Sequence, residues 1–238
     1  MHPDNATMLS SVERTDSNAA AGDYWAQARL IIVREWVDNH DPDSILDIGC
    51  GSGYVTSALA GPGRSTVGVD PDKTAIQRAH RRDTAARFES VLASEAPPGP
   101  FDCVLALDVI EHVDPRDIWP AIADRIARDG TAIVSVPAHP WLYGVHDERA
   151  GHRCRFSRGT LATEAREFGG LDILRTRHTN ALPLPVYALM QRAGIEPPEG
   201  TRGSHGPIVE RCKNAALGIE RRWPLPVGIT LLAELEHQ

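Results

Sequence analysis

Residues 45–54 read ILDIGCGSGY, a short apolar run followed by glycines at positions 49, 51 and 53. Because glycine loses more backbone freedom on folding than any other residue, glycines spaced so closely require a specific reason. A main chain that must approach a bound ligand closely supplies one. The spacing therefore predicts a strand that ends in a ligand-binding loop. Phosphate, a dinucleotide and an adenosyl group with a charged tail are the candidate ligands.

Segments that favour strands and helices alternate on both sides of this loop. Apolar runs predict strands over residues 44–48, 65–69, 86–92, 101–107 and 131–136, and helical spacing predicts helices over 23–39, from the loop to about 60, over 73–81 and over 115–128. Farther along, we expect helices over residues 161–168 and 209–222, and strands over 171–177 and 229–236. This alternation predicts an α/β fold in which a parallel sheet carries helices on both faces.

Composition and charge are those of an ordinary globular protein. The 238 residues are 42% hydrophobic and carry a net charge of −7, which argues against a general affinity for nucleic acid or anionic membranes. The four cysteines form no CxxC pair and have no zinc spacing, so we expect reduced thiols. Residues 1–20 lack the pattern of a secretory signal, and no apolar run reaches a membrane-spanning length. We therefore expect a cytoplasmic protein with a mobile arm over residues 1–21 and one domain over residues 22–238.

The order of the glycines separates the candidate ligands. A dinucleotide-binding loop carries its third glycine where this chain has Tyr54, and a P-loop requires a Gly-Lys-Ser/Thr sequence that does not follow. The spacing D-x-G-x-G-x-G after a first strand instead resembles the class I S-adenosylmethionine (SAM)-dependent methyltransferases. Residues 101–113, FDCVLALDVIEHV, resemble the fourth-strand segment of these enzymes. Residues 136–143, 146–148, 151–156, 180–185 and 225–233 resemble a branch that acts on small molecules.

The resemblance runs from about residue 23 to the C-terminus, with gaps, and it implies both a fold and a cofactor. The implied fold is a Rossmann-like, doubly wound sheet of seven strands, with the last strand antiparallel and helices on both faces. The implied cofactor is SAM. Its expected binding residues are Asp47, Gly49, Cys50, Gly51 and Gly53 in the loop, Asp70 and Pro71 after the second strand, Glu89 in the third-strand region, and Leu107 and Asp108 at the end of the fourth strand.

Two of these assignments have explicit alternatives. The carboxylate of Asp70 can accept hydrogen bonds from both ribose hydroxyls, or it can cap the helix that follows Pro71. The third-strand region lacks the usual Gly-Asp of the family, so adenine binding falls to Glu89 or to a backbone group.

The expected N-terminal helix offers two further candidates, Trp25 and Arg29, on one side of the helix. In one interpretation this helix closes over the cofactor and places Arg29 near its carboxylate. In the other, the aromatic rings of the helix pack in the core.

Polar side chains also follow the fifth expected strand, in residues 138–160. Ligands of open α/β sheets bind beyond the carboxyl ends of the strands, and a histidine near neutral pH can remove a proton from an attacking oxygen or nitrogen. His146 and His152 are therefore the candidate bases, with Asp147 as an orienting partner. The alternative is a solvated surface whose charges pair with one another.

Candidate substrate-binding residues lie in the same region. Arg153 and Arg155 can bind an anionic group, because a guanidinium binds carboxylate or phosphate bidentately. Tyr143 and His112 complete this set. Glu111 could face the substrate together with His112, but a structural role is favoured for it, in which it holds its loop or caps the helix that begins near Pro115. No metal ligand is assigned, because neither an HxxxH nor an HxH spacing occurs among these histidines.

These features together predict a SAM-dependent methyltransferase that acts on an O, N or C nucleophile of a small molecule, a biosynthetic intermediate with an anionic group. The segment 180–228 is expected to cover the substrate side or to form a homodimer contact. A SAM-binding domain repurposed for other chemistry is one alternative, and a protein or nucleic-acid methyltransferase is the other. Residues 107–110, LDVI, argue against the latter, because amino-methylating enzymes usually carry Asn/Asp-Pro-Pro-aromatic there.

Overall fold

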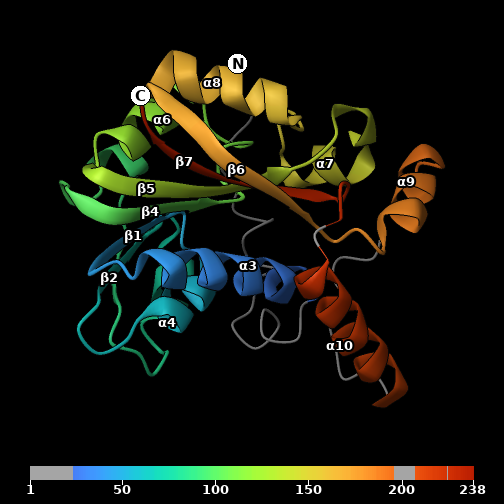
Figure 1. The fold of residues 1–238 in the computed structure, drawn as a ribbon, viewed down its shortest axis with the longest axis horizontal. Coiled ribbons are helices and arrows are strands. Elements are labelled where there is room, and N and C mark those ends of the chain that lie inside the picture. Colours follow the sequence, from blue (N-terminus) through green and yellow to red (C-terminus); the bar gives the residue numbers. More distant parts are fainter. Residues whose placement is uncertain (1–23, 196–206, 224) are drawn as a thin grey trace.

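The computed structural model describes residues 24–195, 207–223 and 225–238 of the chain (Figure 1). The expected mobile arm and most of the Pro/Gly-rich segment 193–208 lie outside the described residues.

The described chain is built around one seven-stranded sheet with the order β3-β2-β1-β4-β5-β7-β6. Strands β1 to β5 pair in parallel, whereas β7 pairs antiparallel with both β5 and β6. The strands are β1 Ser44–Ile48, β2 Ser65–Val69, β3 Arg87–Glu89, β4 Phe101–Leu107, β5 Ile126–Pro137, β6 Leu171–Thr179 and β7 Thr230–His237. The expected doubly wound sheet with an antiparallel last strand is therefore confirmed.

Helices cover both faces of the sheet (Figure 1). The α-helices are α3 Tyr24–His40, α4 Tyr54–Leu59, α5 Lys73–Ala79, α6 Pro115–Ala123, α7 Val145–Ala150, α8 Arg158–Gly169, α9 Leu184–Arg192 and α10 Pro207–Arg222, and the 3-10 helices are η1 Ala93–Glu95 and η2 Pro140–Leu142. Trp119 of α6 and Leu161 of α8 pack on one face, and Val33 and Trp36 of α3 pack on the other. Because β4 is enclosed by both layers, it reads as a continuous apolar run.

The junction between α6 and β5 differs from the sequence-based expectation of a helix to residue 128. The helix ends at Ala123, and β5 begins at Ile126 rather than at 131. Buried Arg125 lies between them and donates to the backbone carbonyls of Ser94, Ala96, Pro97 and Ala121. These tertiary hydrogen bonds hold the chain at the point where it turns into the sheet, which no local pattern indicates.

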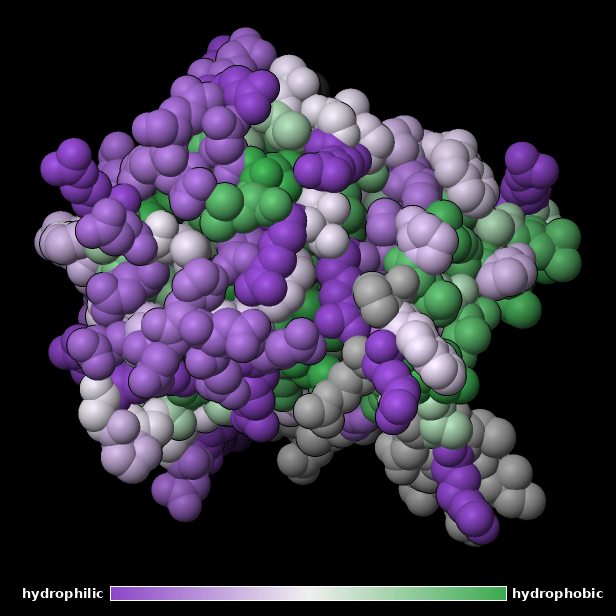
Figure 2. Space-filling view, in the orientation of Figure 1, coloured by the Kyte–Doolittle hydropathy of each residue, from purple (hydrophilic) through white to green (hydrophobic). Residues whose placement is uncertain are grey.

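Two short helices, α7 and α9, were not expected from the sequence. Both lie at the edge where β1, β2, β4 and β5 end, and so do the glycine loop and one end of α10 (Figure 1). Leu142 of η2, Tyr187 of α9 and Ile229 form one buried cluster at this edge. Figure 2 shows apolar residues gathered over α9, where Val186 and Leu189 are 63% and 69% exposed. Among the described residues, no helix is long and apolar enough to cross a membrane.

Candidate functional site

The loop between β1 and α4 needs its glycines for different reasons. Gly49, Gly51 and Gly53 all have left-handed backbones, with φ of 73°, 54° and 74°. A Cβ on Gly49 would overlap the side chain of Val109, and one on Gly53 would lie 2.7 Å from the ring of Phe88. A Cβ on Gly51 would instead meet no described atom within 4 Å. Packing therefore excludes side chains at Gly49 and Gly53, whereas Gly51 borders open space.

Asp70, directly after β2, is joined to this open position. Its carboxylate accepts hydrogen bonds from the backbone amides of Gly51 at 2.9 Å and Asp72 at 2.8 Å, and burial raises its pKa above the ordinary value. The N-cap of α5 is Asp72, whose side chain accepts from the amide of Thr74 at 2.7 Å. Helix capping therefore does not account for Asp70. The open face of Gly51 beside a carboxylate fits an adenosyl ligand whose ribose would approach the main chain.

Three other expected cofactor residues frame the loop. Asp47 of β1 is buried, accepts from Thr56 Oγ1 at 2.6 Å, and has its pKa raised by burial to about 7. The thiol of Cys50 lies against Gly68 of β2, and burial raises the pKa of this thiol as well. Leu107 is buried at the end of β4.

The N-terminal helix is tied to the end of β4 by an ion pair between Arg29 and Asp108. Asp108 has a left-handed backbone, with φ of 56°, and also accepts from Ser135 Oγ at 2.6 Å. Trp25 lies one helical turn earlier, and its ring meets the ring of Tyr187 edge-on at 5.9 Å between centroids. Arg29 and Asp108 thus close one side of the region that the glycine loop borders.

The remaining two expected cofactor residues, Pro71 and Glu89, are exposed at the carboxyl ends of β2 and β3. The backbone carbonyl of Glu89 accepts from the amide of Asp70 at 3.2 Å. Pro71 lies between Asp70 and the N-cap Asp72.

Asp147 of α7 is the centre of a buried polar network on the other side of the site. Both of its oxygens accept from Arg155 Nε at 2.8 Å, and Oδ1 also lies 2.8 Å from Nδ1 of His152. Gln191 of α9 donates to Oδ2 at 3.1 Å. Burial alone would raise the pKa of Asp147, but the hydrogen bonds from His152 and Arg155 outweigh it and hold this pKa below the ordinary value.

The expected substrate-binding residues fall into two environments. Arg155 is only 4% exposed, and it also donates to the carbonyl of Ala138 and the hydroxyl of Tyr187. Its guanidinium therefore binds groups of the protein itself rather than a substrate. Arg153 is exposed and donates to the backbone carbonyl of Val113, and exposed Tyr143 donates from its hydroxyl to the carbonyl of His152 at 2.9 Å.

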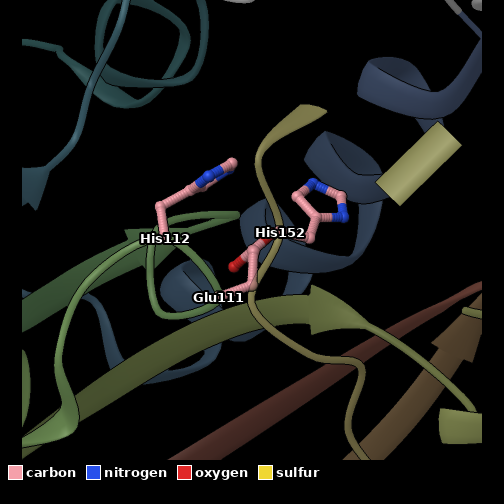
Figure 3. Close-up of side chains that lie close together, drawn as sticks. All are labelled: Glu111, His112 and His152. Carbon is pink, nitrogen blue, oxygen red and sulfur yellow. The ribbon is translucent and has the colours of Figure 1, made fainter. Parts of the chain in front are cut away.

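Histidines from separate segments meet beside Asp147. The ring centroid of His152 lies 4.9 Å from that of His112 and 6.0 Å from that of His146. Glu111 lies beside them, and side-chain atoms of Glu111, His112 and His152 that can bind a metal lie within 4.8 Å of one another (Figure 3). Burial raises the pKa of Glu111 to about 8, and burial together with His152 lowers the pKa of His112 to about 4.

This cluster was missed by the sequence analysis, which gave Glu111 a structural role and assigned no metal ligands. Glu111 and His112 follow β4, whereas His152 follows α7, so no short motif links them. The available signal is the acidic residue inside the apolar run of residues 101–113. His139, which lies in the same region of the sequence, instead stacks on His178, with 5.2 Å between the two ring centroids.

Comparisons with known proteins agree with this geometry. The sequence profile of the family described as "Methyltransferase domain" matches residues 21–173. A ubiquinone biosynthesis O-methyltransferase of Thiobacillus denitrificans is 35% identical over 106 residues, which are 40% of this chain and 45% of that protein. The chain thus spans about half the length of the curated relatives it matches.

Solved structures show the same fold. A TehB-like SAM-dependent methyltransferase from Corynebacterium glutamicum has a TM-score of 0.58 at 19% identity, covering 99% of this chain and 100% of that one. Magnesium protoporphyrin IX methyltransferase from Synechocystis PCC 6803, with bound SAH, has a TM-score of 0.55 at 16% identity, covering 89% and 83%. With the glycine loop and the profile match over residues 21–173, this chain belongs to the class I S-adenosylmethionine-dependent methyltransferase family.

Proposed function

We propose that this protein transfers the methyl group of SAM to an oxygen, nitrogen or carbon nucleophile of a small molecule that carries an anionic group. The observation that carries the proposal is the open face of Gly51 beside the carboxylate of Asp70. Val109 packs on Gly49 of the same loop and lies two positions before Glu111, so the turn that carries Glu111 and His112 follows a residue that contacts the glycine loop. A cofactor region and an acceptor region therefore adjoin at one edge of the sheet.

On the cofactor side, the residues of this chain bind and orient. SAM supplies a methyl group on a positively charged sulfur. The nucleophile attacks the methyl carbon in line with the carbon–sulfur bond, and the sulfur leaves as the neutral thioether. Asp70 accepts hydrogen bonds from the ribose hydroxyls, and the backbone of Gly49 to Gly53 follows the methionine part. Leu107 and Asp108 pass the methionine end, with Arg29 held near them by its ion pair with Asp108. The proposed cofactor site also includes Trp25, Asp47, Cys50, Pro71 and Glu89.

On the acceptor side, Asp147 orients His152. Since Nδ1 of His152 faces the carboxylate of Asp147, Nε2 keeps its lone pair available to the acceptor region. His146 lies next to it and is the second candidate base. Tyr143 and His112 border this region, and the exposed Arg153 binds the anionic group. Arg155 supports the site by fixing Asp147.

The small-molecule assignment is favoured over the alternatives. Residues 107–110 lack the Asn/Asp-Pro-Pro-aromatic sequence of amino-methylating enzymes, and the net charge of −7 disfavours nucleic acid. The O-methyltransferase relative acts in the biosynthesis of a small molecule, ubiquinone. The described cysteines Cys50, Cys103 and Cys154 are free thiols, which agrees with a reducing cytoplasm.

The test combines SAM titration with a search for the acceptor. Calorimetric titration with SAM is expected to show one site per chain, and Asp70→Ala is expected to weaken it by about 1–3 kcal/mol, because hydroxyl donors lose a charged acceptor. Asp72→Ala is the matched control, since it removes the cap of α5 but leaves the contact with Gly51. A panel of phenols, amines and carboxylic acids is then assayed for release of demethylated SAM. Failure to bind SAM overturns the proposal, and binding without release for any acceptor favours a repurposed domain.

A further inference from the structure

We propose that Glu111, His112 and His152, which follow β4 and α7, bind a divalent first-row transition-metal ion. Each residue offers one ligand atom, and these atoms lie within 4.8 Å of one another. Figure 3 shows the side chains converging from the turn after β4 and from the segment after α7. The proposal goes beyond methyl transfer, because ion binding does not depend on the identity of the acceptor.

The strongest observation is the state of Glu111. This residue is 1% exposed, and neither of its carboxylate oxygens accepts a hydrogen bond from any other described residue. A buried carboxylate without a partner is costly, and buried charges in proteins are usually paired or bound to metals. A cation between Glu111 and the two imidazoles supplies that missing partner.

The ring of His152 is oriented as that of a metal-binding histidine usually is. A ligating histidine typically donates its second ring N–H to a carboxylate or a backbone carbonyl, which fixes the ring and the tautomer. His152 has this arrangement, with Nδ1 2.8 Å from Asp147 Oδ1. Asp147 is fixed in turn by Arg155 and Gln191. The outer shell of the site is thus built from buried, hydrogen-bonded groups.

The backbone holds the two contributing segments together. The amide of Arg153 donates to the carbonyl of Glu111 at 2.9 Å, and the amide of His152 donates to the carbonyl of Asp147 at 2.9 Å. The side chain of Arg153 adds a hydrogen bond to Val113. His152 is therefore anchored to the turn that carries Glu111 and His112, and the ligand atoms are not brought together by flexible side chains alone.

The ligand set selects the class of ion. Two imidazole nitrogens and one carboxylate oxygen suit zinc, iron, cobalt or manganese, whereas calcium and magnesium favour sites built from oxygen ligands. Three protein ligands also leave coordination positions open. If the proposed function holds, an oxygen of the methyl acceptor takes one of them, and His146 is left as the proton acceptor. That last step rests on the proposed function, whereas ion binding does not.

The test measures ion binding directly, with the full chain carrying no histidine tag and freed of metal by chelation. Titration with Co²⁺ is expected to give visible d–d absorption bands that saturate at one ion per chain and are displaced by Zn²⁺. Glu111→Gln and His152→Ala are each expected to weaken Co²⁺ binding at least about 100-fold, because a direct ligand contributes more than an outer-shell partner. His80→Ala, which removes the exposed histidine at the C-terminal end of α5, is the matched control.

The variants also separate ion binding from folding and from methyl transfer. Glu111→Gln removes a buried carboxylate without changing its shape, so it is expected to unfold at the same temperature as the parent or higher while SAM binding persists. Stoichiometric Co²⁺ binding that is lost in both ligand variants, but kept in His80→Ala, supports the site. Absence of stoichiometric binding, equal binding by all variants, or binding of Mg²⁺ in preference to Co²⁺ and Zn²⁺ overturns it. None of these readouts requires a known acceptor, so failure of the proposed function is scored separately.

Discussion

The backbone amide of Gly51 donates a hydrogen bond to the carboxylate of Asp70 across 2.9 Å, which joins the segments that follow β1 and β2 at the open position of the glycine loop. A Cβ at Gly51 would meet no described atom within 4 Å, so a side chain there costs backbone strain, because φ is 54°, but its Cβ overlaps no other part of the described protein. A substitution at Gly51 is therefore expected to impair SAM binding more than folding.

Gly51→Val is expected to abolish SAM binding while the protein stays folded. The substitution adds backbone strain, because φ is 54°, and it places a branched side chain where the cofactor would lie. Gly63→Val is the matched control, since Gly63 has φ of 82° and equally open surroundings but lies between α4 and β2, away from the loop. Calorimetric titration with SAM and thermal melting of both variants provide the measurement. Normal SAM binding by folded Gly51→Val would show that the loop assignment is wrong.

His152→Ala and His146→Ala are each expected to reduce turnover by about 10²-fold or more if the acceptor must lose a proton. Affinity for SAM should change little, because both rings lie on the side of Asp147 rather than on the side of Gly51. Steady-state kinetics with the acceptor identified in the screen, together with SAM titration, make the comparison. Wild-type turnover in both variants would show that neither histidine accepts the proton of the acceptor, and it would leave the cofactor assignment intact.

Substitutions of the two neighbouring arginines are expected to have different effects. Arg153→Ala should raise the Michaelis constant for an anionic acceptor and leave stability nearly unchanged, since this side chain is exposed. Arg155→Ala should lower the free energy of unfolding by roughly 3–5 kcal/mol, because it leaves the carboxylate of Asp147 buried without its ion-pair partner. Urea titrations and kinetics of both variants test this. Equal stability of the two variants would contradict the structural role given to Arg155.

Much of the fold was predictable because its central strands are buried and sharply bounded. The bounds of β1, β2 and β4 agree with the sequence-based expectation, since each is an apolar run that ends at a glycine loop or an aspartate. The start of β5 was not predictable, because it depends on the hydrogen bonds of Arg125 to distant carbonyls. The helix α9 was missed for a similar reason, because it is held by Tyr187 and Gln191 against the Asp147 network.

The site divides in the same way. The glycine loop and Asp70 occupy consecutive strand ends, so spacing along the sequence brings them together. The meeting of Glu111 and His112 with His152 depends on tertiary contacts, chiefly the backbone bond between Arg153 and Glu111. No local periodicity encodes such a contact, which is why the sequence analysis assigned no metal ligand there.

Asp47 gives a prediction about pH. Burial raises its pKa from 3.8 to about 7, so between these values the folded protein retains a proton that the unfolded chain has released. The free energy of unfolding should therefore decrease as the pH rises through this window and become independent of Asp47 above it. Asp47→Asn keeps an oxygen that can accept from Thr56 but removes the titration.

The measurement is a series of urea titrations of the parent and Asp47→Asn between pH 4 and pH 8. The stability of the variant relative to the parent should increase across the window, by up to about 4 kcal/mol, because a pKa difference of one unit corresponds to about 1.4 kcal/mol. Other carboxyl groups titrate in both proteins, so they cancel in the difference. A difference that stays constant from pH 4 to pH 8 would show that Asp47 is ionised in the folded protein throughout, with Arg29 compensating its charge.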